Sequence, residues 1–169
     1  MTSEHARPTI RAVEDRDHEA VHAILTSRSV IDGTMRVPYA AFHTTQDRLK
    51  PEPGVYRLVA EVDGSVVGFA ELITTPQHPR AAHMGDLNMV CTHPDHQGRG
   101  IGRALVGAVL ELADDWLGLT RISLVVFAGN DHATRLYERC GFEQEGVIRR
   151  MNHTRGQYVD GVMMGRLRG

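Results

Sequence analysis

Several features that would place a chain in a specialised class are scarce or missing here. With only two cysteines, Cys91 and Cys140, among 169 residues, the chain has no disulfide scaffold, and a reducing cytoplasm is the expected compartment. No apolar run approaches bilayer length, and residues 1–5 lack the basic and apolar pattern of a secretion signal, so we expect no membrane partner. Acidic and basic residues are interspersed and the formal net charge is −2, which argues against a nucleic-acid partner.

The length suits one domain with its own core, and we expect residues 1–169 to form a single domain. Alternating apolar patterns predict a mixed α/β fold with the element order βααβββαβαββ and no internal repeat. The expected strands cover 9–13, 56–62, 65–74, 82–92, 122–127, 145–153 and 157–167. The expected helices cover 15–27, 38–49, 101–116 and 131–140, with a loop over 29–36 and a type I′ turn at 63–64.

The segment from Gln97 to Gly102 is the most informative stretch, with glycines at positions 98, 100 and 102. It follows an apolar-rich strand that ends near Cys91, and it opens an amphipathic helix at Ile101. Glycines let the backbone approach a ligand closely, and the free N–H groups of a helix N-terminus attract an anion. This order predicts a site for a phosphate-bearing ligand, although a tight turn before a helix would use the same glycines.

Two common phosphate loops do not match this spacing. A Walker loop needs Lys and then Ser or Thr after its last glycine, whereas Gly102 is followed by Arg103 and Ala104. The dinucleotide fingerprint needs G-x-G-x-x-G and an acidic residue at the end of the next strand, which here ends in Phe127-Ala128. The pattern that remains is Q-x-x-G-x-G.

A second segment, residues 130–142, reads N-x-x-A-x-x-L-Y-x-x-x-G-F. Asn130 or Asp131 can cap a short helix, and Gly141 can end it. The residues that share one face of this helix are Ala133, Leu136, Tyr137 and Cys140. By residue pattern alone, we expect residues 131–140 to form a helix that packs its apolar face on the core, with the hydroxyl of Tyr137 at the edge of that core.

The two segments, in this order and at this separation, resemble the cofactor-binding motifs of the GNAT (GCN5-related N-acetyltransferase) family. The resemblance implies a central twisted mixed sheet of about seven strands flanked by about four helices, with acetyl-CoA as the acyl-donor cosubstrate. The segments 34–38, 83–87 and 156–160 resemble the branch of L-amino-acid and phosphinothricin acetyltransferases. That branch implies acetyl transfer to the primary amine of an amino acid or similar small compound, and a homodimer. A protein N-terminus or lysine as acceptor, or a non-catalytic acyl-CoA-binding module, remains as an alternative.

The resemblance also assigns acetyl-CoA to particular positions. The backbone of residues 89–91 would run beside the pantetheine arm like an added strand, and a bulge near Val90 or Cys91 would free an N–H group for an oxyanion. The positions expected to bind acetyl-CoA are Met89, Val90, Cys91, Gln97, Gly98, Arg99, Gly100, Ile101, Gly102, Asn130 and Tyr137.

Tyr137 is the expected general acid, because the family places a Tyr at this point of the motif and a hydroxyl can protonate a leaving thiolate. Packing and cofactor positioning are the alternative for this residue. Asp86, on the central strand, is the expected general base, and Glu71 on the neighbouring strand is the reserve. A hydrogen-bonded or merely exposed carboxylate is equally compatible with the position of Asp86.

The resemblance further implies acceptor contacts from Met35, Val37, Asp86 and Tyr158. His93 and His96 are three residues apart and could be read as a pair of metal ligands. Pro94 and the loop setting argue against a rigid ligand pair, so we expect no metal. Cys91 has no activating base near it in the sequence, so we expect direct attack by the amine rather than a covalent enzyme intermediate.

Overall fold

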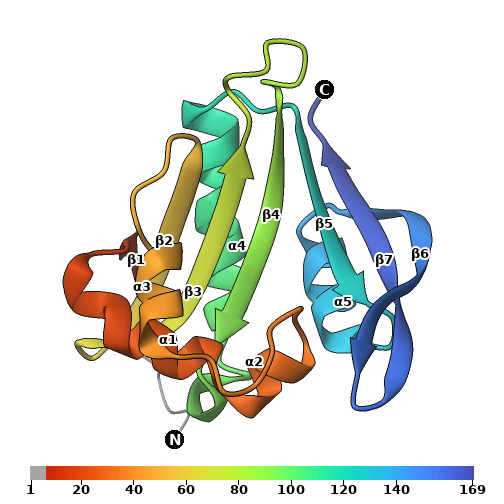
Figure 1. Cartoon of the computed structure of the whole chain (residues 1–169). Coiled ribbons are helices and arrows are strands. Elements are labelled where there is room, and N and C mark those ends of the chain that lie inside the picture. Colours follow the sequence, from red (N-terminus) through yellow and green to blue (C-terminus); the bar gives the residue numbers. More distant parts are fainter. Residues whose placement is uncertain (1–6) are drawn as a thin grey trace, which may run out of the picture.

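The computed structural model of the protein describes residues 7–169, and its centre is one seven-stranded sheet (Figure 1). The strand order across the sheet is β1-β2-β3-β4-β5-β7-β6. Neighbouring strands are antiparallel except β4 and β5, which run parallel, so the expected mixed α/β fold is confirmed. The strands are β1 (Thr9–Ala12), β2 (Val55–Val62), β3 (Ser65–Thr74), β4 (Met84–Thr92), β5 (Arg121–Phe127), β6 (Glu143–Thr154) and β7 (Gln157–Leu167).

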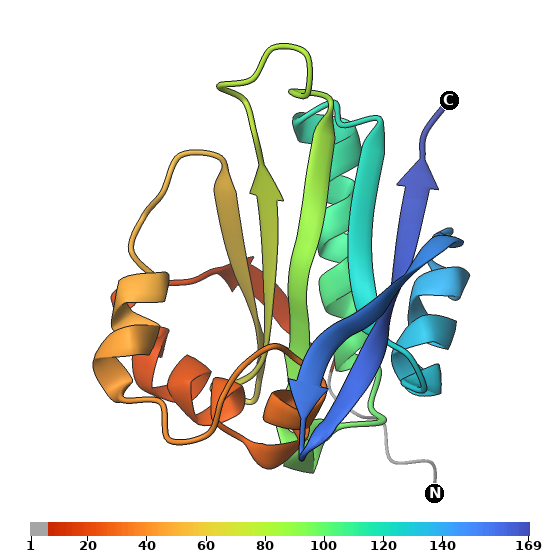
Figure 2. The same cartoon turned by 45° about the vertical axis from the view of Figure 1, so that its right-hand side comes forward.

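Helices cover the sheet on both faces, with α1 and α3 on one side and α4 and α5 on the other (Figures 1 and 2). Their bounds are α1 (His18–Leu25), α2 (Arg28–Asp32), α3 (Phe42–Arg48), α4 (Ile101–Glu111) and α5 (Asp131–Arg139). Short 3₁₀ turns precede α1 and follow β4, and α4 continues into a π-helical turn at Leu112–Trp116. Among residues 7–169, no helix is both long and apolar enough to cross a bilayer.

Two apolar cores lie on the two faces of the sheet, because side chains alternate between the faces along each strand. The larger core joins α4 and α5 to the sheet, for example through Leu105 and Tyr137. The smaller core joins α1 to the opposite face and contains Phe69, Met89 and Cys91. A side chain at Gly68 would collide with Ile101 and Leu105 at 2.8 and 2.9 Å, so the absence of a side chain there lets α4 lie directly on β3.

The segment between β1 and β2 differs from the expected one. Residues 28–32 form α2 where a loop was expected, and the helix expected from Pro38 begins only at Phe42. Pro38 suits a helix start, but Tyr39 has a φ of 65° and therefore cannot continue a right-handed helix. The element order is thus βαααβββαβαββ with five helices, and residues 33–41 are a long loop.

The sheet is joined at its middle by a short seam. β4 and β5 pair only at Met84–Asp86 and Arg121–Ser123, after which the two strands diverge (Figure 2). On either side the pairing is long: β5 matches β7 over seven residue pairs, from Arg121 to Phe127. The divergence leaves the facing edges of β4 and β5 without strand partners, and it opens a gap that only a ligand or side chains can fill.

Candidate active site

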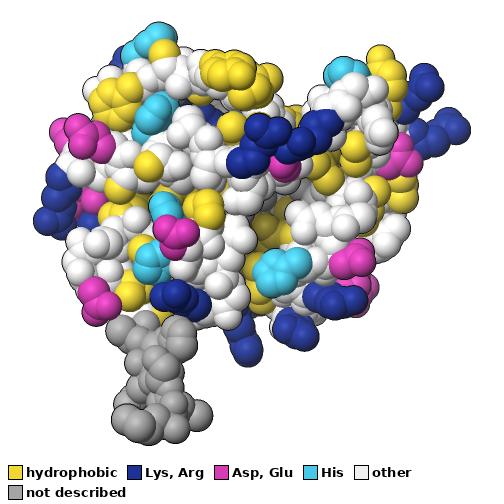
Figure 3. All heavy atoms as spheres, turned by 90° about the horizontal axis from the view of Figure 1, so that it is seen from below, with side chains coloured by type: hydrophobic (Ala, Val, Ile, Leu, Met, Phe, Trp, Pro, Cys, Tyr) yellow, Lys and Arg dark blue, Asp and Glu magenta, His cyan; other side chains and the backbone are white. Residues whose placement is uncertain are grey.

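A cleft of about 1030 Å³ lies between the diverging strands β4 and β5. Loop 33–41 borders it on one side, and α5, β6 and β7 contribute the other walls. Seen from below, the surface is hollowed between two lobes and apolar side chains, drawn in yellow, lie in the hollow (Figure 3). Five of the seven methionines of the chain line this cleft: Met35, Met89, Met151, Met163 and Met164.

β4 carries a bulge at the wall of the cleft. Leu87 pairs with Leu72 and Met89 pairs with Glu71, so Asn88 is the extra residue. The sequence analysis placed this bulge near Val90 or Cys91, but those two residues remain in register with β3, and the irregularity lies two residues earlier. A bulge turns backbone groups out of the ladder, so N–H groups beside Asn88 are available to a ligand in the cleft.

The glycine-rich loop follows β4 and has the backbone geometry of an anion site. Gly98 and Gly100 have φ values of 74° and 79°, and a Cβ at either position would meet nothing within 4 Å. The hydrogen bond from Ala104 N to the carbonyl of Gly100 is the first helical one of α4, so the preceding N–H groups are free of helical partners. The expected role of these glycines is therefore compatible with their conformation and with the open space around them.

Two other residues of this motif have structural contacts. The Nε2 atom of Gln97 donates to the hydroxyl of Ser29 at 3.2 Å, which ties the loop to α2. A Cβ on Gly102 would lie 3.3 Å from Leu136, so this glycine also serves the contact between α4 and α5. The motif residues Gln97 to Gly102 lie outside the cleft volume itself, as does Cys91.

Asn130 and Tyr137 bring the second motif to the cleft. The Oδ1 atom of Asn130 accepts from the backbone N of Ala133 at 3.2 Å, which caps α5 as expected. Tyr137, about two helical turns further on, is 8% exposed and packs edge to face with Phe142. Burial raises the pKa of Tyr137 well above its ordinary value, so the phenol stays protonated at neutral pH. Its hydroxyl can therefore act as a proton donor.

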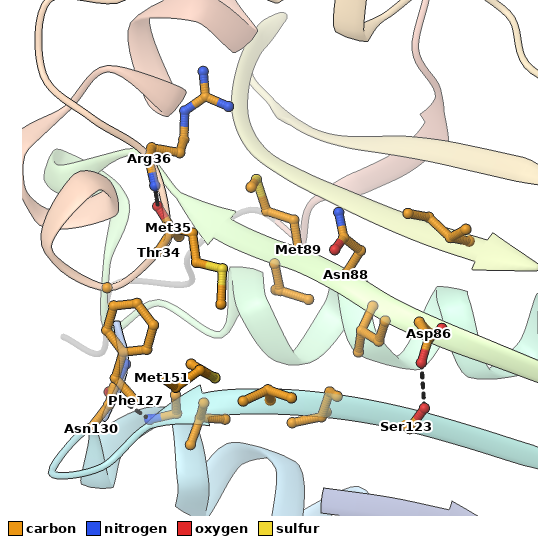
Figure 4. A pocket seen from close by; sticks show the side chains of 18 of the residues that line it. Thr34, Met35, Arg36, Asp86, Asn88, Met89, Ser123, Phe127, Asn130 and Met151 are labelled. Carbon is orange, nitrogen blue, oxygen red and sulfur yellow. Dashed lines mark hydrogen bonds between the residues drawn. The ribbon is translucent and has the colours of Figure 1, made fainter. Parts of the chain in front are cut away.

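The two candidate carboxylates have opposite surroundings. Asp86 is exposed in the cleft and accepts a hydrogen bond from the hydroxyl of Ser123 across the seam (Figure 4). Glu71 is 2% exposed and lies outside the cleft lining. Its Oε1 accepts from Arg48 at 2.6 Å and from Asn88 at 2.7 Å, and its Oε2 accepts from Arg57 at 2.8 Å. Both oxygens of Glu71 are therefore occupied by hydrogen bonds from two guanidinium groups and an amide, so its geometry suits holding the arginines.

Cys91 has the environment of a structural thiol. It is 7% exposed, its Sγ donates to the carbonyl of Phe69 at 3.7 Å, and burial raises the pKa of the thiol to about 12. A thiol that stays protonated is a poor nucleophile.

The expected acceptor contacts divide into two groups. Met35, Val37 and Asp86 line the cleft, and Met35 points toward Met151 (Figure 4). Tyr158 does not line it: this residue stacks against the guanidinium of Arg150 at 4.9 Å on the outer hairpin. Its expected contact with the acceptor has no support from this position.

Several lining residues were missed by the sequence analysis. They come from segments far apart in the chain and form no local motif, so only the folded structure brings them together. Thr34 and Arg36 lie in a segment that was expected to be a loop (Figure 4), but no local pattern indicates that this loop lies beside β4. The missed residues with polar or large side chains are Thr34, Arg36, Arg48, Asn88, Arg121, Ser123, Phe127, Glu145 and Met151.

The histidines near the glycine-rich loop have local contacts. The Nδ1 atom of His93 accepts from the backbone N of Asp95 at 3.2 Å and so caps the 3₁₀ turn at Pro94–His96. Its ring packs edge to face with that of His96. Within residues 7–169, no group of three or more His, Cys, Asp or Glu side chains has a metal-binding arrangement.

A strand pair that splays around a cleft, a bulged β4 and a glycine-rich start of α4 together define an acyltransferase type of fold. The acetyltransferase (GNAT) family profile matches residues 19–142. The chain belongs to the GNAT family, whose members are N-acetyltransferases.

Individual relatives agree with this assignment. The chain is 38% identical over 159 residues to the L-amino acid N-acetyltransferase AaaT of Escherichia coli (strain K12), which covers 94% of this chain and 97% of that protein. It is 31% identical over 163 residues to the phosphinothricin N-acetyltransferase of Alcaligenes faecalis, covering 94% and 81% respectively. A spermidine N-acetyltransferase from Vibrio cholerae, solved with CoA and spermine, superposes with a TM-score of 0.84 at 28% identity and 96% coverage of both chains.

Proposed function

We propose that the protein transfers the acetyl group of acetyl-CoA to the primary amine of a small acceptor, an amino acid or an amino-acid-like compound, by direct attack. The observation that carries this proposal is the position of the buried Tyr137 in a cleft whose opposite wall is the bulged edge of β4. The 38% identity to an L-amino acid N-acetyltransferase supports this choice of acceptor.

The chain offers matching contacts for the donor, acetyl-CoA. The loop at Gly98 and Gly100 presents backbone N–H groups and a helix N-terminus to a pyrophosphate. The unpaired edge of β4 over residues 87–90 offers backbone groups to the amides of the pantetheine arm, in the manner of strand addition. Asn130 lies on the far wall, where its Nδ2 amide can donate to the same arm.

Catalysis in this proposal is mainly positioning, assisted by two polar groups. An N–H group beside the bulge at Asn88 stabilises the charge that develops on the thioester oxygen. Tyr137 donates its proton to the thiolate as CoA leaves, because burial keeps its phenol neutral. The attacking amine needs no covalent help from the protein once it has lost its own proton.

Asp86 is the proposed acceptor of that proton. It is open to the cleft and lies on the same strand face as Asn88. Strand geometry separates the backbones of the two residues by about 7 Å, so the side chain of Asp86 and one water can together reach an amine beside the bulge. Glu71 was the reserve, but both of its oxygens already accept hydrogen bonds from Arg48, Arg57 and Asn88. We therefore assign Glu71 to positioning rather than to proton transfer.

An ion pair beside the cleft supports a small acceptor rather than a protein chain. Arg155, at the turn between β6 and β7, donates to Asp32 at the end of α2 through two hydrogen bonds of 3.0 and 2.6 Å. Asp32 precedes Gly33, which lines the cleft, so the pair ties loop 33–41 to the β6–β7 hairpin, and in this proposal it limits the room for an extended peptide. The expected cytoplasmic location, the homodimer and the single domain over residues 1–169 stay predictions.

The test is CoA thiol release from acetyl-CoA with amino acids, polyamines, aminoglycosides and short peptides as acceptors. Wild type should turn over amino acids, and Tyr137→Phe should lower kcat by about 100-fold or more while keeping its affinity for acetyl-CoA. Tyr56→Phe is the matched control, because Tyr56 is partly buried in the apolar core away from the cleft. Wild-type turnover in Tyr137→Phe would reduce Tyr137 to a packing residue.

A further inference from the structure

Two arginines that line the cleft have buried donors without partners. Within residues 7–169, the buried side-chain nitrogen and oxygen atoms that lack a hydrogen-bond partner are Nε of Arg36, Nε of Arg48 and Nδ1 of His96. Arg36 and Arg48 both line the cleft. A buried donor without a partner is costly, so two of them on one cavity wall indicate that a ligand supplies the missing acceptor.

The charge on this wall is also unbalanced. Glu71 is shared between Arg48 and Arg57, so one carboxylate faces two guanidinium groups. Arg36 forms no ion pair with any residue in the described part of the chain, and burial together with the charge of Arg48 lowers its pKa. Glu52 lies 3.9 Å from Arg57, but it is on the solvent side of the cluster. Of the carboxylates that line the cleft, Asp86 accepts from Ser123 and Glu145 pairs with Arg121, so within residues 7–169 Arg36 is left without a carboxylate partner and would attract an anion.

The arginines lie close to the place where the amine must react. Asn88, the bulge residue of β4, donates to the same Oε1 atom of Glu71 that accepts from Arg48. Arg36 extends from loop 33–41 on the same side of β4 as Met89, while Met35 points the other way, toward β5 (Figure 4). Arg36 and Arg48 thus belong to the α1–α3 face, whereas the glycine-rich loop opens α4 on the opposite face.

We infer that Arg36 and Arg48 form a carboxylate subsite and that the acceptor is an α-amino acid rather than a polyamine. In an α-amino acid the carboxylate is attached to the carbon that bears the amine. A carboxylate held by the two arginines would therefore place the amine next to the bulge at Asn88. A polyamine has only positive charges to present and would be repelled by the same wall. This inference rests on the proposed function.

The rest of the cleft lining indicates which side chains an amino-acid acceptor can have. The five methionines on its walls make an apolar surface, and the unbranched methionine side chain adapts to ligands of different shape. We therefore expect large apolar side chains, such as those of leucine, methionine and phenylalanine, to be accepted with similar efficiency.

The experiment compares each amino acid with its carboxamide, which keeps the amine and the side chain but lacks the negative charge. With L-leucine, L-methionine and L-phenylalanine, wild type should show a kcat/KM at least about 10-fold above that of the amide. Arg36→Met keeps the apolar stem and removes the charge. It should raise the KM for the amino acids by about 10- to 100-fold and leave the amides and acetyl-CoA unchanged.

Two further variants complete the design. Arg36→Lys keeps the charge but loses the planar fork, so it should recover part of the affinity. Arg16→Met is the control for removing an exposed arginine, because Arg16 is 67% exposed and remote from the cleft. Equal losses for amino acid and amide, or a raised KM for acetyl-CoA, would overturn the carboxylate subsite. So would turnover of spermidine above that of every amino acid.

Calorimetric titration of the same three amino acids, without acetyl-CoA, separates the subsite from the proposed function. Binding that depends on Arg36 without any CoA release would keep the subsite and refute the acetyltransferase activity on these acceptors. Equal turnover of the amino acids by wild type and Arg36→Met would support the acetyltransferase activity and refute the carboxylate subsite. No binding and no turnover with any of the three would refute the inference outright.

Discussion

The two sides of β4 offer different kinds of groups to a ligand: backbone groups on one side and charged side chains on the other. On the α4 face the groups offered to a ligand are backbone groups, namely the N–H groups of the glycine-rich loop and the free edge of the strand. On the α1–α3 face they are charged side chains, with Arg36 and Arg48 beside a buried Glu71. Backbone contacts recognise a feature common to many ligands, whereas a cluster of side chains can be altered one residue at a time. The donor face therefore depends on backbone conformation, whereas the acceptor face depends on individual side chains.

The largest expected effect is on the backbone-built face. Gly100→Glu places a negative side chain, in a strained left-handed conformation, where a pyrophosphate is expected. Because like charges in contact cost several kcal/mol, affinity for acetyl-CoA should fall by more than about 100-fold in a calorimetric titration. Gly118→Glu is the matched control: Gly118 has a φ of 62° and open space around it, but it lies outside the cleft and the loop. Wild-type affinity in Gly100→Glu would refute the loop assignment.

The second-largest effect is expected at Asp86, where β4 pairs with β5 between the two faces. Asp86→Asn should lower kcat/KM by about 100-fold at neutral pH if Asp86 accepts the proton of the amine. A base acts only when unprotonated, so the pH–rate profile of Asp86→Asn should differ from that of the wild type. Asp115→Asn, at an exposed position outside the cleft, should leave the profile unchanged. A wild-type profile in Asp86→Asn would transfer the role to water alone.

The smallest effect concerns the ion pair that ties the start of α1, on the charged face, to β1. Arg11 donates to both oxygens of Asp17 at 2.7 and 2.9 Å, and it holds the pKa of this 3% exposed carboxyl below its ordinary value. In the unfolded chain the pKa of an aspartate is about 4. Because folding lowers the pKa of Asp17, the ionised carboxylate stabilises the fold at pH values above about 4, and this stabilisation is lost as the pH falls through the pKa of the folded state. Asp17→Asn should cost about 2 kcal/mol at pH 7 in urea unfolding, and clearly less at pH 3.

Asp15→Asn serves as its control, since the carboxylate of Asp15 is fully exposed and its nearest cation is His18 at 3.9 Å. The control should lose little stability at either pH. Equal destabilisation by Asp17→Asn at pH 7 and pH 3 would show that the pair contributes through packing rather than through charge.

The contrast between the faces also explains what could be predicted from the sequence. The glycine-rich loop and the segment 130–142 are local, and each residue has a backbone or capping role that its type reveals. The carboxylate cluster is not local: Arg48, Arg57, Glu71 and Asn88 come from α3, β2, β3 and β4. No spacing rule connects them, so Glu71 was considered as a base without its partners.

The wrong prediction of a helix from Pro38 also had a non-local physical cause. Pro38 and the polar residues after it match a helix start, and nothing local indicates that Tyr39 takes a positive φ. Tertiary contacts of loop 33–41 with the cleft override the propensity. Residues 39–41 of the acceptor wall were therefore the part that the pattern described least well, whereas Met35 and Val37, which the sequence analysis named, line the cleft.

The strand order has a consequence for the synthesis of the chain. β5 touches β4 at three residue pairs only, and its long partner, β7, follows about thirty residues later. At ribosomal rates of 5–20 residues per second, β5 waits about 2 to 6 s for that partner, exposing the apolar edge of an unfinished sheet. The β1–β4 half can pair as soon as it emerges, whereas the wall that carries Tyr137 is completed last. Chaperone dependence during translation should therefore concentrate in the interval between β5 and β7.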